Sequence, residues 1–242
     1  MNRQRNRAVA LATALAGIFL LSTCQQFFTA SLATALARDS YTIPADISVA
    51  DAINLLDAAI AEGDATMAAA LVPGLFAAAE AASAGSDAAA YNEAANALVS
   101  AVVLSSGVGP VVTTVATLFL SADPEADPAL MISEAITSVS SIALSVEETD
   151  ALLLIASNPP AGLSADDAYT AAFALVADAF VDAEVDLAEL TEFNLDTPPA
   201  GVDPATLAAA LDLLSYADGL PVEEGSSSMF ADLFSSMGLS AP

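Results

Sequence analysis

The sequence predicts an all-α protein, and three observations carry this prediction. Apolar residues make up 56% of the 242-residue chain, aromatic residues only 6%, and the apolar fraction is rich in alanine and leucine. Such a composition favours helices that pack closely through small side chains. Serine or aspartate repeatedly stands just before a run with helical spacing, as N-cap residues do. These runs also recur at a nearly constant interval, which is typical of repeated helix pairs.

Each expected helix begins at a recognisable cap. Ser48 begins the first helix, with Asp51 in the capping-box position and Gly63 at its end. The first helices of later hairpins are expected to begin at Ser86, Asp127-Pro128, Ser164 and Asp203-Pro204, the last of them ending before Gly219. The second helices are expected to begin near Asp64, Gly109-Pro110, Ser145 (with Glu148 completing a capping box) and Ser226.

The caps of the first helices follow one another at intervals of about 39 residues. Pro159-Pro160-Ala161-Gly162 recurs as Pro198-Pro199-Ala200-Gly201, each time just before a cap. These repeats predict a single all-helical domain, 46–242, built as an α-solenoid-like array of stacked helical hairpins in five blocks. A period of this length is similar to that of HEAT-like repeats. The alternative is an irregular Ala-rich helical bundle.

The fourth block predicts one amphipathic helix that runs from Ser164 to Asn194, because apolar residues recur there in steps of three and four without a breaker. Four acids fall on the side opposite this apolar stripe: Asp178, Asp182, Asp186 and Glu189. The acidic ridge, as we call these four residues, is a candidate site for a cationic partner or a cation. The other interpretation is an ordinary solvated helix face.

The amino terminus has the layout of a secretory leader. Arg3, Arg5 and Arg7 precede an uncharged apolar run over 8–21, which is too short to span a membrane, and Cys24 follows closely. The segment Leu21-Ser22-Thr23-Cys24 resembles the lipobox of bacterial lipoprotein precursors.

The resemblance implies a signal peptide over 1–23, lipidation of Cys24, a tether over 24–45, and attachment to the cell envelope. Gln25 after the cysteine favours the outer membrane within that family. Two alternatives stay open: cleavage after Ala37, which gives a secreted or periplasmic protein, and an uncleaved anchor.

The charge of the chain and the residue types that it lacks exclude several classes of function. The chain has 31 acidic residues, all of them after Arg38, and neither lysine nor histidine occurs. Such a surface repels nucleic acid, so we expect no nucleic-acid partner. A serine nucleophile lacks a basic partner, and phosphoryl transfer lacks its cations, so we expect no enzyme activity and no cofactor.

No metal site is expected either. Asp123, Glu125 and Asp127 imitate the start of an EF-hand loop, but Pro128 occupies the position that requires glycine. The uncharged stretch 94–122 is interrupted by Gly107, Gly109 and Pro110 and is expected to form a buried hairpin.

The function that these observations favour is a non-catalytic binding or scaffolding lipoprotein. It is tethered to the membrane through the lipid on Cys24, and its acidic helical surface recognises another envelope protein. The alternative is a solute-binding or transport-accessory protein with a ligand pocket between hairpins. A hydrolase that uses a pair of carboxylates, as glycosidases do, is a third hypothesis.

Overall fold

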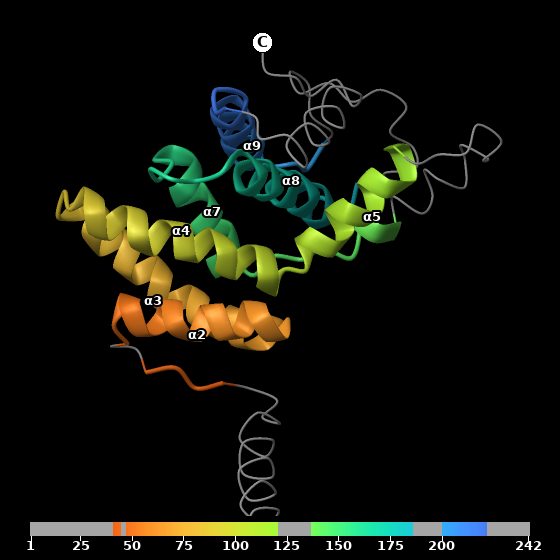
Figure 1. Cartoon of the computed structure of the whole chain (residues 1–242). Coiled ribbons are helices and arrows are strands. Elements are labelled where there is room, and N and C mark those ends of the chain that lie inside the picture. The colour runs from red at the N-terminus through yellow and green to blue at the C-terminus, as the bar shows by residue number, and fades with distance from the viewer. Residues whose placement is uncertain (1–40, 45–46, 121–136, 186–199, 222–242) are drawn as a thin grey trace, which may run out of the picture. The chain divides into compact units, whose positions relative to one another are not determined.

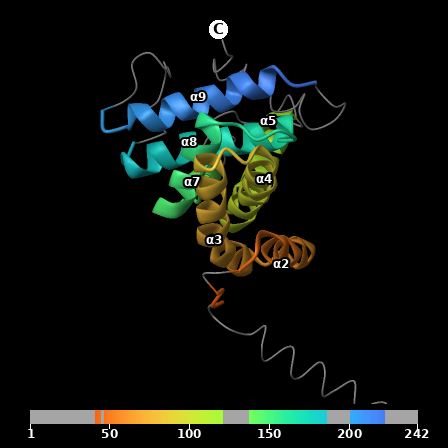
Figure 2. The ribbon, with the colours of Figure 1, turned by 90° about the vertical axis from the view of Figure 1, so that its left-hand side faces the viewer.

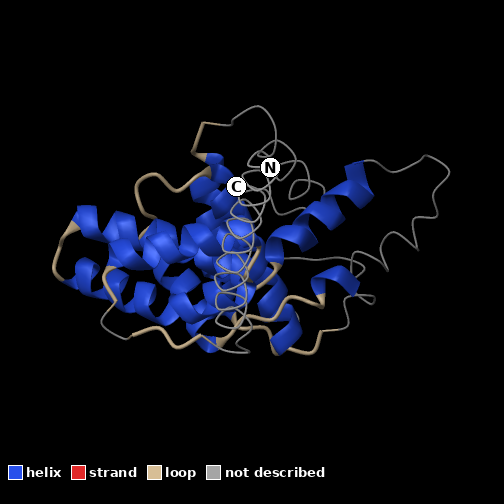
Figure 3. Ribbon diagram, turned by 60° about the horizontal axis from the view of Figure 1, so that its bottom comes forward, coloured by secondary structure: helices blue, strands red, loops and turns tan. Residues whose placement is uncertain are grey.

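The computed structural model describes residues 41–44, 47–120, 137–185 and 200–221, without the side chains of 116–120 (Figure 1). The chain divides into two compact units, Met1–Tyr41 and Thr42–Pro242, and almost every described residue belongs to the second. Throughout the described ranges the secondary structure is helical, with loops and turns between helices and no strand (Figure 3). The all-α prediction is therefore confirmed.

Figure 1 labels the described helices. They are α2 (Val49–Glu62), α3 (Ala65–Ala84), α4 (Ala88–Ser105), α5 (Val108–Leu120), α7 (Val146–Ser157), α8 (Ala165–Asp182) and α9 (Pro204–Asp218). Helix α3 packs against α2 and α4, and α8 packs against α9. In Figure 2, α8 and α9 run side by side and crosswise to α3 and α4.

Polar side chains cap the helix N-termini, as the sequence predicted. The Ser48 hydroxyl accepts a hydrogen bond from the Asp51 amide at 3.1 Å, and Asp64 accepts one from the Met67 amide at 2.9 Å. Ser164 and Asp203 cap α8 and α9 in the same way. Each cap satisfies backbone N–H groups that have no partner within the helix. The partial positive charge at these N-termini also favours nearby carboxylates in a chain that has no basic side chain after Arg38.

Two expected helix starts were misplaced by one or two residues. The cap of α4 is Asp87, not Ser86, because Ser86 adopts a left-handed turn conformation with φ 56°. Helix α5 begins at Val108, so Pro110 lies inside its first turn. Proline is tolerated there because the first N–H groups of a helix have no partner within it. The starts expected at Asp127-Pro128 and Ser226 lie outside the described residues.

The prediction of one long helix from Ser164 to Asn194 is wrong, because α8 ends at Asp182. Glu184 turns left-handed with φ 52°, and the Val185 amide donates to the Phe180 carbonyl at 3.1 Å. This hydrogen bond closes a Schellman-type end, in which Val185 packs into the same small cluster as Phe180. The turn carries glutamate where glycine is usual, so the sequence offered no stop signal.

The stacked hairpin array is not confirmed. Hairpins of a linear array contact only their neighbours in sequence. In this fold, however, α7 packs against α3 and α9, and α8 packs against α4 and α5. These contacts between distant blocks fit the irregular bundle, which was the alternative. Local likeness between repeats does persist, since Gly162 and Gly201 both have φ 94° in the loops before α8 and α9.

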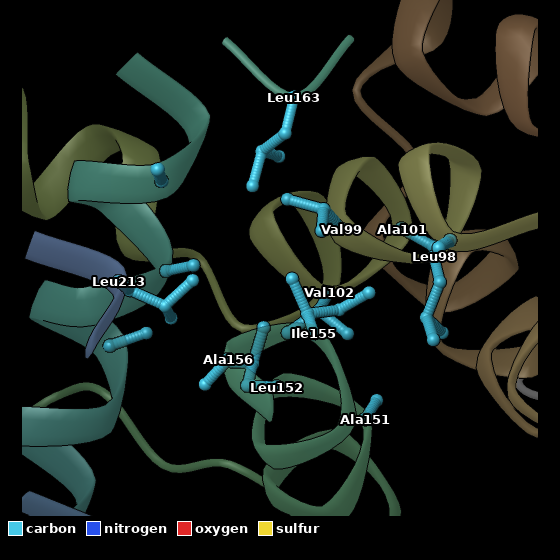
Figure 4. Close-up of a cluster of buried hydrophobic side chains, with 14 of the residues drawn as sticks. Leu98, Val99, Ala101, Val102, Ala151, Leu152, Ile155, Ala156, Leu163 and Leu213 are labelled. Carbon is cyan, nitrogen blue, oxygen red and sulfur yellow. The ribbon is translucent and has the colours of Figure 1, made fainter. Parts of the chain in front are cut away.

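One hydrophobic core joins the described helices. Figure 4 shows Leu98 and Val102 of α4, Leu152 and Ile155 of α7, and Leu213 of α9, all fully buried. Leu163, from the loop before α8, is also buried and belongs to the same core. Alanine fills much of the remaining core, so the helices approach one another closely.

The uncharged stretch 94–122 forms α4 and α5 as far as it is described, and it bends by 68° between them near Gly107. This break agrees with the predicted interruption, but the expected buried hairpin is wrong, because the chain bends at this point without reversing, and Thr113 and Thr114 of α5 are exposed. Among the described helices, α3 alone is long and apolar enough to cross a membrane, with a mean hydropathy of 1.5, and α4 with α5 would pass only as a bent pair. Core helices also pass this test, and α3 contributes Leu71, Val72 and Leu75 to the core.

Candidate functional site

The four residues of the acidic ridge do not form the exposed row that the sequence predicted. Asp178 is buried, with 4% of its surface exposed, whereas Asp182 one turn later is exposed. Asp186 and Glu189 lie outside the described residues. The expectation that Asp178 faces solvent is wrong because α4, α5, α7 and α9 all pack against α8 and enclose it.

Asp178 joins α8 to the N-terminal end of α7. Its Oδ1 accepts a hydrogen bond from the Leu144 amide at 3.1 Å, and its Oδ2 lies 2.9 Å from the Thr149 hydroxyl. Burial raises the pKa of Asp178, and repulsion from Asp182 and Glu148 acts in the same direction. The hydrogen bonds from Leu144 and Thr149 oppose this rise in pKa without cancelling it.

Glu148 is a second buried carboxyl at the start of α7, with 7% of its surface exposed. Its Oε2 accepts hydrogen bonds from the Ser145 amide at 2.8 Å and the Ser145 hydroxyl at 2.9 Å, which completes the predicted capping box. Its Oε1 accepts a hydrogen bond from the Ser105 hydroxyl of α4. Glu148 therefore fixes the start of α7 against α4.

Two buried tyrosines hold the C-terminal ends of other helices. The Tyr91 hydroxyl of α4 donates to the Asn158 carbonyl at the end of α7, and the Tyr169 hydroxyl of α8 donates to Asp218 at the end of α9. Burial raises the pKa of both phenols, and Asp218 raises that of Tyr169 further. Neither phenol is therefore a candidate base at neutral pH, and both have structural roles.

Side chains of two helices, α4 and α9, hold the loop 159–162 by hydrogen bonds. On α4, Asn92 Oδ1 accepts from the Ala161 amide at 2.8 Å and Asn96 Nδ2 donates to the Ala161 carbonyl at 3.0 Å. On α9, the Tyr216 hydroxyl donates to the Pro160 carbonyl at 3.4 Å. The sequence marked this loop as a repeat but gave no sign of the residues that bind it, because they are distant in the chain.

A pocket of about 260 Å³ lies beside the start of α8. Its lining comes from the loop and first turn of α8 and from the segment after α9, namely Gly162, Leu163, Ser164, Ala165, Asp166, Leu220 and Pro221. Typical small-molecule sites enclose roughly 300–1,000 Å³. The pocket is thus small, and Asp166 is the one ionisable side chain in its lining.

No family model matches the chain. No curated protein and no solved structure is significantly similar to it either.

The described polar clusters hold helices and loops together, so their roles are structural. Among the described residues, no three side chains of His, Cys, Asp or Glu gather in a way that could hold a metal ion. Glu148 and Asp178 are the two buried carboxyls of the described ranges, and both accept hydrogen bonds at the start of α7. Cys24, the predicted lipidation site, lies outside the described residues.

Proposed function

We propose that this chain is an envelope-tethered lipoprotein that binds or scaffolds another protein without catalysis. The observation that carries the proposal is a lone cysteine, Cys24, directly after a basic and apolar leader. A leader of this kind directs export, and acylation of the cysteine would tether the domain to the membrane, with the outer membrane as the favoured destination.

The charge of the helical domain supports a basic protein partner. No lysine, arginine or histidine follows Arg38, so none of the domain's acids can form an internal salt bridge. Exposed acids occur on separate helices, for example Asp57 of α2, Glu93 of α4 and Asp212 of α9. Charges of one sign on a surface speed the approach of an oppositely charged protein and repel anionic partners such as nucleic acid.

An affinity pull-down of the full-length tethered protein from its own envelope tests this function. At low salt we expect one basic protein to be retained in saturable amounts, and its association rate should fall as NaCl is raised. The matched control is elution with an equal osmolality of sucrose, which does not screen charge and should release nothing. An empty pull-down at low salt would contradict the proposal.

The pocket beside α8 supports a second candidate, a solute-binding or transport-accessory protein. Its single carboxyl, Asp166, favours a small neutral or cationic solute over an anion. Saturable heat-stabilisation by a solute would support this candidate, because a ligand that binds only the folded state stabilises it. Loss of that effect in Leu220→Trp, which fills the pocket, would place the solute there.

A further inference from the structure

The Thr149 hydroxyl lies between two acceptors, Asp178 Oδ2 and the Ser145 carbonyl. The Thr149 Oγ1 lies 2.9 Å from Asp178 Oδ2 and 3.2 Å from the Ser145 carbonyl oxygen, and both distances are hydrogen-bonding ones. A hydroxyl has a single hydrogen, so it can donate to only one of these acceptors. With Asp178 ionised, Thr149 donates to Asp178 Oδ2, and the Ser145 carbonyl keeps only the hydrogen bond from the Thr149 amide at 2.9 Å.

Burial and the charged groups that face Asp178 make its ionisation unfavourable, because only 4% of its surface is exposed. Within the part of the chain that the structure describes, the charges that act on Asp178 are those of Glu148 from α7 and Asp182 from α8, and both are acids. No cation from the same domain can offset them, because the last basic residue of the chain is Arg38. The compensation that remains comes from the Leu144 amide and the N-terminal end of α7.

We propose that Asp178 is a pH-sensitive contact between α7 and α8. It holds the start of α7 against α8 when its carboxyl is protonated. In its neutral form, the Oδ2 hydroxyl donates to Thr149 Oγ1, and Thr149 donates in turn to the Ser145 carbonyl. The Leu144 amide continues to donate to Oδ1, so every polar group of the contact is satisfied. Loss of the proton removes one of these hydrogen bonds and leaves a buried charge beside Glu148, which weakens the contact.

The raised pKa of Asp178 sets the direction in which pH changes the stability of the fold. A carboxyl with a raised pKa in the folded state binds its proton more tightly there than in the unfolded state. Its contribution to stability is fully present below the pKa of the unfolded chain and is lost as pH rises through the raised pKa. The contact therefore tightens in acid and loosens as pH rises toward neutral.

The test compares the thermal unfolding of the full chain with that of Asp178→Asn between about pH 4 and about pH 7. Asparagine cannot ionise, and its amide can donate to Thr149 as the neutral carboxyl does. We expect the wild-type Tm to fall more steeply with pH than that of the variant. Each unit by which the pKa is raised changes the folding equilibrium about tenfold, which corresponds to about 3–5 °C in Tm.

Asp212→Asn is the matched control, because it removes one acid from the exposed surface of α9, and Asp212 is not among the groups whose charge acts on Asp178. Its Tm should fall with pH as steeply as that of the wild type. This result would separate the effect of the buried contact from the general repulsion between acids. A variant Asp178→Asn that is less stable at neutral pH and has the wild-type slope would overturn the proposal. If Asp178→Asn does not fold, the titration of Asp178 in the wild type can be followed by carboxyl NMR. A pKa at or below the ordinary 3.8 would overturn the proposal.

Discussion

Replacement of Leu152 by alanine should lower the free energy of unfolding by about 3 kcal/mol, which corresponds to a fall in Tm of roughly 10 °C. Leu152 is fully buried in α7, where it meets Ile155 of the same helix in the shared core (Figure 4). Its truncation removes apolar contacts and leaves a cavity that the surrounding alanines are too small to fill. Urea or thermal denaturation of the two proteins measures the difference.

Val146→Ala is the matched control on the same helix, because the Val146 side chain is 75% exposed. It should change stability by less than about 0.5 kcal/mol. The shape of the transition also separates the two architectures. In a bundle with one core, Leu152→Ala should shift a single transition, whereas a linear array should lose a local unit first. Equal stability of the two variants would contradict the core assignment of α7.

Salt should stabilise the protein strongly, with a rise in Tm of roughly 10 °C between low salt and about 1 M NaCl. Without the leader, 31 acids face one arginine, and their mutual repulsion opposes the compact state. Two charges 10 Å apart repel by about 0.4 kcal/mol in water, and many such pairs sum to several kcal/mol. At 1 M the screening length is about 3 Å, which removes most of this repulsion.

Two comparisons show whether screening is the cause. NaCl and KCl should act equally, because screening depends on ionic strength and not on the identity of the ion. The effect should also shrink near pH 4, which is close to the ordinary pKa of these acids, because about half of their charge is lost there. A flat response to salt at neutral pH would mean that the acids are too dispersed to repel one another, and it would contradict this prediction.

Helix starts were predictable because a cap is a local interaction. Ser48, Asp64, Ser145 and Ser164 each bind an amide three residues ahead, so the residue type and its spacing contain the whole signal. The same reasoning failed where packing between distant residues determines the end of a helix. The end of α8 depends on Val185 reaching the cluster of Phe180, and no residue near the turn announces that contact.

The candidate site was less predictable than the fold. The spacing placed Asp178 and Asp182 on one side of α8, but it could not show that α7 would cover Asp178. A helical period identifies the faces of one helix and not the number of neighbours around it. The partners of Asp178, Leu144 and Thr149, lie about 30 residues away in sequence, and no motif links them to it.

The central claim is that Cys24 tethers this helical domain to a membrane, and the intact mass of the membrane-extracted protein tests it most directly. We predict a chain that starts at Cys24 and carries an added mass of acyl lipid, and treatment that hydrolyses ester-linked acyl groups should remove part of that mass. A chain that starts at Arg38 without lipid would contradict the account and favour a secreted protein. A chain that retains its leader would contradict it equally and favour an uncleaved anchor.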